Sequence, residues 1–158
     1  MAFSRLIAAP LIASSLLLSA CGETEEAPAE FDGIAGLEIS NARMVLGAVE
    51  GNPAAVYFDA SYSGDRAFSI RTADVAGAKS SVMHTYGEWN REVQMMDAGL
   101  IPVKNGTEVS FKPGDLHIMA MEPSPELKPG GKTEVTIIIS GGDKHSFEAE
   151  ILAAGDER

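Results

Sequence analysis

The chain has 158 residues, a formal net charge of −11 at pH 7, 45% hydrophobic residues and 22% charged residues. These proportions are typical of a folded globular domain and argue against a disordered or fibrous chain. The acidic excess argues against binding to nucleic acid, and against docking on anionic lipid through a basic patch. A single cysteine excludes an intrachain disulfide and a cysteine-rich zinc site.

The first 20 residues are predicted to be an export signal. Arg5 supplies an early positive charge, and an apolar run over residues 6–18 follows it. The run is short for a membrane span and ends in small residues, as expected before a cleavage point. Removal of residues 1–20 would take Arg5 away and leave a charge of −12.

Cys21 is predicted to be the lipidated first residue of the mature chain. The ending Leu-Ser-Ala-Cys over residues 18–21 resembles the bacterial lipobox, and Cys21 is the sole cysteine. An ordinary secretory signal with an incidental cysteine is the alternative. If the source is Gram-negative, Gly22 gives no signal for retention in the inner membrane, which favours the outer membrane. We therefore expect a lipid-anchored protein on the periplasmic side of a bacterial membrane.

The residues after Cys21 are expected to form a tether up to residue 34. Residues 22–30 are acidic, contain proline and lack large apolar side chains, so they cannot bury enough surface to order themselves. The folded domain is expected over residues 35–153, with a short tail over residues 154–158.

The body of the chain has the pattern of an all-β protein. Apolar and polar residues alternate in short segments that are rich in strand formers, and turn signals such as Asn105-Gly106 and Pro113-Gly114 separate them. No convincing helical period is present. The prediction is a single Greek-key β-sandwich or small barrel, with strands at residues 37–42, 55–62, 67–75, 107–111, 116–121, 133–140 and 146–152, and a longer loop at residues 122–131.

The candidate chemistry lies between residues 83 and 121, where five methionines accompany two of the three histidines. In a strand, alternate side chains share a face, so His117, Met119 and Met121 would point the same way. Such a face is an unusual core stripe but a suitable ligand set for a soft metal. Imidazole suits copper, and thioether selects Cu(I) over harder ions.

A second segment, over residues 82–96, is predicted to form a hairpin centred between Trp89 and Asn90. In that register His84 lies directly across from Met95, and opposed residues have Cβ atoms about 4.5–5.5 Å apart. One ion could then contact both side chains.

Together these residues give the spacing His84, ten residues, Met95, twenty-one residues, His117, one residue, Met119. This H-x10-M-x21-H-x-M spacing resembles that of the PCuAC-type periplasmic copper chaperones. The segments around residues 54–58 and 111–114 also resemble that family, and the resemblance covers roughly residues 35–153.

The resemblance implies a cupredoxin-like β-sandwich that binds one Cu(I) ion through His84, Met95, His117 and Met119. It also implies that the protein carries copper to client proteins, notably the copper centre of a haem-copper oxidase during assembly. The His/Met-rich C-terminal extension of many relatives is not matched here, so a second copper site is not expected.

The other residues of this region have weaker assignments. Met121 is a possible extra ligand or a hydrophobic rim, and Trp89 could cover the copper, meet a partner or be a simple exposed turn residue. The remaining assignments are core for Met83 and Met96, cross-strand packing for Tyr86, and an exposed, unrelated position for His145.

No catalytic motif is present, so the protein is not expected to be an enzyme: we find no paired carboxylates, nucleophile elbow or phosphate loop. Two alternatives to the chaperone remain. One is a copper-buffering lipoprotein with the same site, and the other is an immunoglobulin-like adhesion or scaffold lipoprotein whose histidines and methionines are structural.

Overall fold

A computed structural model describes residues 33–156 of the chain. The predicted signal, Cys21 and most of the tether therefore lie outside the described residues. Ten strands make up the described part: β1 (Leu37–Val45), β2 (Ala54–Tyr62), β3 (Phe68–Val75), β4 (Ala78–Trp89), β5 (Glu92–Asp97), β6 (Ile101–Val103), β7 (Thr107–Phe111), β8 (His117–Pro123), β9 (Lys132–Ile139) and β10 (Lys144–Leu152).

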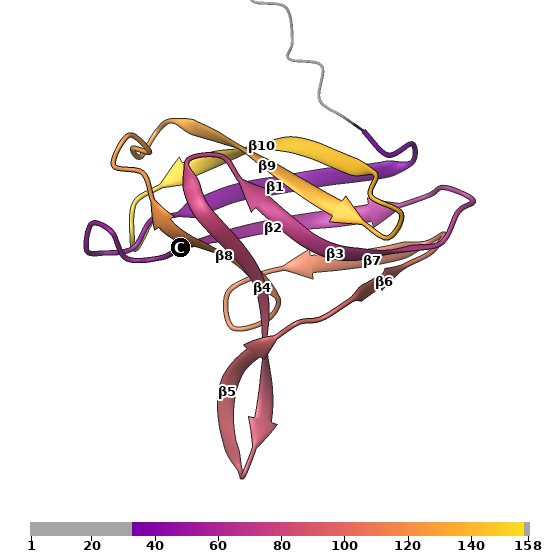
Figure 1. Cartoon of the computed structure of the whole chain (residues 1–158), viewed down its shortest axis with the longest axis horizontal. Helices are drawn as coiled ribbons and strands as arrows, with labels where there is room; N and C mark the ends of the chain where they lie inside the picture. The colour runs from indigo at the N-terminus through magenta and orange to yellow at the C-terminus, as the bar shows by residue number, and fades with distance from the viewer. Residues whose placement is uncertain (1–32, 157–158) are drawn as a thin grey trace, which may run out of the picture.

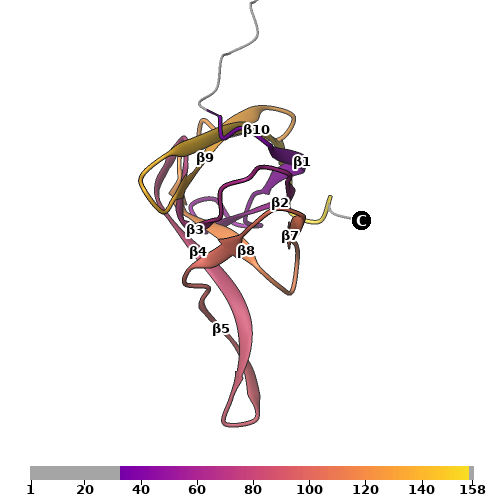
Figure 2. The same ribbon diagram turned by 90° about the vertical axis from the view of Figure 1, so that its right-hand side faces the viewer.

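The strands form one continuous sheet that curls into a barrel-like sandwich (Figures 1 and 2). Its order is β5-β4-β8-β2-β1-β10-β9-β3-β6, and β7 also pairs with β2. The β1–β10 pair is parallel, and the other pairs are antiparallel. Neighbours in the sheet are often distant in sequence, as in Greek-key folds. The described part of the chain contains no helix that could span a membrane.

The barrel closes where β3 approaches β4. The two strands join through a tight turn in which Gly77 has a φ of 76°, a conformation that glycine adopts without strain. The Ser81 hydroxyl then donates a hydrogen bond to the Ala73 carbonyl oxygen. This side-chain hydrogen bond therefore links β3 and β4, which share no ladder of backbone hydrogen bonds.

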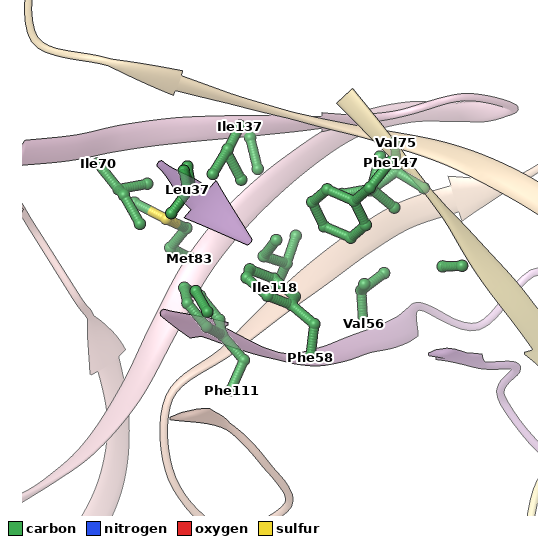
Figure 3. Packing of buried hydrophobic residues seen from close by; sticks show 14 of the residues in the cluster. Leu37, Val56, Phe58, Ile70, Val75, Met83, Phe111, Ile118, Ile137 and Phe147 are labelled. Atoms are coloured by element: carbon green, nitrogen blue, oxygen red, sulfur yellow. The ribbon is translucent and has the colours of Figure 1, made fainter. Parts of the chain in front are cut away.

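The core fills the barrel from the inward face of each strand (Figure 3). The burial pattern of β2 alternates strictly along Ala54–Ala60, as a half-buried strand requires. Phe58 is fully buried and stacks on Phe111 with ring centroids 4.1 Å apart, while Phe147 lies 4.9 Å from it. Each such side chain contributes about 1.5–3 kcal/mol by leaving water.

Strand β4 has two halves with different neighbours. Its first half, Ala78 to His84, pairs with β8 in the barrel wall, and its second half, His84 to Trp89, pairs with β5. The β4–β5 hairpin projects away from the barrel (Figures 1 and 2). His84 belongs to both ladders and marks the point where the hairpin leaves the barrel.

Candidate metal centre

Two histidines meet at the root of the hairpin. His84 of β4 lies directly opposite His117 of β8 in the antiparallel ladder. Their ring centroids are 5.9 Å apart with an interplanar angle of 67°. A metal–imidazole bond is about 2 Å and a ring nitrogen lies about 1 Å from the ring centre, so two rings that share one ion have centroids no more than about 6 Å apart. The pair is therefore close enough to bind one ion.

His117 is held by a hydrogen bond that leaves one nitrogen available. Its side chain is buried, and Nδ1 lies 2.7 Å from the backbone carbonyl oxygen of Asp115. A carbonyl oxygen can only accept, so in the neutral ring Nδ1 carries the proton and donates it. The lone pair is then on Nε2, which is how metal-binding histidines are commonly oriented.

His84 has a buried nitrogen without a partner. Its Nδ1 is shielded from solvent and has no hydrogen bond to any residue that the structure describes. Buried polar atoms are nearly always paired, because an unpaired one costs about 1–3 kcal/mol. A metal ion that binds this nitrogen would give it a partner.

The methionines of β8 continue the same face. Met119 lies across from Val82 of β4 and from Ala55 of β2, while Ile118 and Ala120 are buried in the core. The alternation predicted for this segment is therefore present: His117, Met119 and Met121 share the face opposite the core, and Met121 lies opposite Ser80, two residues beyond Met119. Met119 is partly buried, and along β8 it lies nearer to His117 than Met121 does.

The predicted register of the hairpin is wrong by two residues. His84 pairs with Asp97, and Met95 pairs with Tyr86. The turn residues are Asn90 and Arg91, both with positive φ (56° and 68°), which is the backbone of a two-residue type I′ turn. A shift of two residues keeps every side chain on its face, so Met95 stays on the face of His84 as a diagonal neighbour, within reach of its long side chain.

Two tyrosines flank His117, and one of them was not singled out from the sequence. Tyr57 of β2 and Tyr86 of β4 have ring centroids 6.3 and 5.8 Å from that of His117. Arg43 lies over the ring of Tyr57, with its guanidinium carbon 5.2 Å from the ring centroid. The alternation of β2 puts Tyr57 on the outward face, but its contact with His117 depends on the pairing of β2 with β8, which no local pattern indicates.

The donor set contains soft and neutral atoms rather than carboxylates. In the described part of the chain, no three or more His, Cys, Asp or Glu side chains form a metal-binding group. The arrangement thus offers two imidazoles and nearby thioethers, a set that suits Cu(I) better than zinc or a hard divalent ion.

The family model for LpqE-like lipoproteins matches residues 37–151 of the chain. The chain belongs to the LpqE-like family. Among curated proteins, none matches its sequence significantly.

Solved structures similar to this LpqE-like chain are PCuAC domains. The apo PCuAC domain from PmoF1 has a TM-score of 0.63 and 16% identity, over 78% of this chain and 99% of that domain. The copper-bound PCuAC domain from PmoF2 has a TM-score of 0.60 and 18% identity, over 78% of this chain and 98% of that domain. CuI-DR1885 from Deinococcus radiodurans has a TM-score of 0.55 and 18% identity, over 78% of this chain and 85% of that protein. The predicted cupredoxin-like all-β fold is confirmed.

Other residues of the LpqE-like chain differ in part from their predicted places. Met83 is buried in the core as predicted, but Met96 is 42% exposed, because the hairpin continues beyond the barrel and β5 has no core to face. Trp89 is 69% exposed at the hairpin end and belongs to the alternate set of side chains from His84 and Met95.

His145 is not the exposed, unrelated residue that its turn-rich surroundings predicted. It is half-buried on β10, and its Nδ1 accepts a hydrogen bond from the Ile34 backbone N–H at 3.0 Å. Burial lowers the pKa of His145. The residue therefore fastens the start of the described chain to the barrel in its neutral form.

Proposed function

We propose that this protein is an extracytoplasmic Cu(I) metallochaperone that binds one ion through His84, Met95, His117 and Met119. We further propose that Cys21 anchors it to the membrane by a lipid, and that it delivers copper to a client such as the copper centre of a haem-copper oxidase. No catalytic step is part of this proposal.

One observation carries the copper site. The buried Nδ1 of His84 has no hydrogen-bond partner in the described part of the chain, and the His84 ring lies 5.9 Å from the ring of His117. Met119 continues the face of His117, and Met95 lies diagonal to His84. These four side chains are the ones that the H-x10-M-x21-H-x-M spacing indicates, although the predicted register of the hairpin was wrong by two residues.

The donor chemistry favours Cu(I) and its transfer. Two imidazoles and two thioethers are all neutral, so none of the ion's charge is cancelled, and thioethers need no deprotonation to bind. Without a thiolate, an acceptor with cysteine ligands can take the ion by ligand exchange. The copper-bound state of the similar PmoF2 domain supports copper as the ion, and the Cu(I) state of DR1885 supports its oxidation state.

The test is a Cu(I) titration under anaerobic, reducing conditions against a colorimetric chelator. The parent protein should remove one equivalent of Cu(I) from the chelator, and the Met95→Ala/His117→Ala double variant should lose this competition. Met96→Ala is the matched control, because Met96 is as exposed as Met95 (42% and 43%) but lies on the other face of the hairpin. No competition by the parent would contradict the copper site and favour the adhesion or scaffold alternative.

A copper buffer would have the same site, so affinity alone does not separate it from a chaperone. Transfer does: a chaperone should pass Cu(I) to the apo form of an oxidase copper-centre domain faster than free dissociation allows. The anchor is tested separately, since Cys21→Ser should release the exported protein in soluble form. A variant that stays bound to the membrane would contradict lipidation.

A further inference from the structure

Exposed apolar side chains gather on the β4–β5 hairpin. Within the described residues, the large hydrophobic side chains exposed elsewhere are Val49, Leu100 and Val82, which lies in the barrel wall. Soluble proteins rarely leave such a group uncovered unless it binds something. The hairpin group, with its exposed fractions, comprises Tyr86 (40%), Val93 (74%) and Met95 (43%) on the face of His84, and Trp89 (69%) and Met96 (42%) on the other face.

The hairpin also has the shape of a docking element. It projects from the barrel, as both ribbon views show, and all six residues of β5 are exposed. Strand β5 ends the sheet, so its outer edge has no neighbouring strand in the described part of the chain. Its sequence, Glu-Val-Gln-Met-Met-Asp, has none of the prolines or lysines that usually protect an edge strand.

The charges around this surface indicate the kind of partner. Glu88, Glu92 and Asp97 outnumber Arg91 on the hairpin, and the whole chain carries −11. A second copy of the chain would bring the same acidic rim against the first, which is unfavourable. A partner with an apolar patch and a basic rim would be attracted instead, and its approach would be accelerated by the long-range field.

The surface is continuous with the proposed copper site. His84 lies in both the barrel ladder and the hairpin ladder, and Met95 stands two residues from the His84 partner Asp97. An acceptor whose ligands replace those of the ion therefore approaches the root of the hairpin. From there, an apolar patch on the acceptor can contact the exposed hairpin side chains.

We propose that the β4–β5 hairpin is the docking surface for the copper-accepting protein, which meets it with an apolar patch rimmed by lysine or arginine. This inference rests on the proposed copper function. It adds that the hairpin residues outside the proposed ligand set determine the rate of transfer to a protein, while the ligands determine the affinity.

The test compares two recipients of Cu(I) from the loaded protein: the apo copper-centre domain of a haem-copper oxidase and a small chelator. Trp89→Ser/Val93→Ser removes two apolar contacts, and Glu88→Lys/Glu92→Lys reverses the acidic rim. Val49→Ser is the matched control, because Val49 is 62% exposed and lies in the segment between β1 and β2.

Each double variant should slow transfer to the copper-centre domain by roughly tenfold or more, while removal by the chelator stays at the parent rate. Raising the salt concentration should slow protein transfer for the parent and less so for the charge-reversed variant. Unchanged transfer in both double variants, or parent transfer no faster than dissociation, would overturn the proposal. A failure of the copper function itself would appear earlier and separately, as a parent that does not bind Cu(I) in the chelator titration.

Discussion

Strands β8 and β5 both contribute proposed ligands, but the two strands are built differently. In β8, Ile118 and Ala120 are fully buried, and His117 is 4% exposed with its ring fixed by the Asp115 carbonyl. In β5, every residue is exposed, and Met95 is supported by the partner strand of the hairpin alone. One half of the proposed site is therefore positioned by the barrel core, and the other half lies on an element that has no core.

This difference has a consequence for function. Ligands whose positions are fixed before binding lose little conformational entropy when the ion arrives, so the barrel half should supply most of the affinity. A ligand on an exposed hairpin can leave the ion without disturbing the core, which suits an ion that must be handed over. The two halves should therefore differ in stability, in ligand strength and in their response to substitution.

Removal of core volume should affect the barrel far more than the hairpin. Phe58 is fully buried between Phe111 and Phe147, so Phe58→Ala should lower the free energy of unfolding by about 3–5 kcal/mol. Val93 on the hairpin is 74% exposed, and Val93→Ala should change it by less than about 0.5 kcal/mol. Urea denaturation of both variants measures this, and similar losses would mean that the hairpin is part of the core.

The ligands of the two halves should contribute unequally to the affinity for Cu(I). His117→Ala should weaken Cu(I) binding by at least about 100-fold, since even partners behind a ligand cost 10–100-fold when removed. Met95→Ala should cost roughly tenfold, because its side chain is 43% exposed and has less fixed support. Chelator competition gives both values. Equal losses, or a larger loss for Met95→Ala, would contradict the division into two halves.

The smallest effect is a pH dependence of stability at His145, far from both ligand strands. Burial lowers the pKa of His145, so the unfolded chain takes up a proton on this ring more readily than the folded one. Its contribution to stability is therefore complete above the ordinary histidine pKa of about 6.5 and is lost as pH falls. Protonation also removes the acceptor for the Ile34 N–H.

The comparison is with His145→Gln, whose side-chain oxygen can accept the same bond at any pH. Between pH 7.5 and pH 5, urea denaturation should show the parent losing up to about 1 kcal/mol more than this variant. Parallel losses in the two proteins would show that His145 does not titrate across this interval on folding.

Much of the fold followed from local patterns, because alternation along β2 and β9 is strict enough to identify each buried face. Strand β6 escaped prediction, since it is three residues long and contains Pro102. The hairpin register failed because its turn, Asn90-Arg91, lacks the glycine that usually marks a type I′ turn. The exposure of Met96 and the burial of His145 depend on where the barrel ends, which is tertiary information.

The candidate site was more predictable than the hairpin that carries part of it. Faces repeat every two residues, so a register error of two left Met95 on the face of His84. The pairing of His84 with His117 joins segments more than thirty residues apart and was not predicted, since the family resemblance implied only that both side chains bind one ion. The flanking position of Tyr57 needed the structure itself.

The most direct test of the account is X-ray absorption of the Cu(I)-loaded protein and its Met95→Leu variant. Leucine keeps the size of the side chain and removes the sulfur. The account predicts two nitrogen and two sulfur neighbours in the parent, and loss of one sulfur with both nitrogens retained in the variant. A parent spectrum without sulfur, or a sulfur count that Met95→Leu leaves unchanged, would contradict a site shared between the barrel and the hairpin.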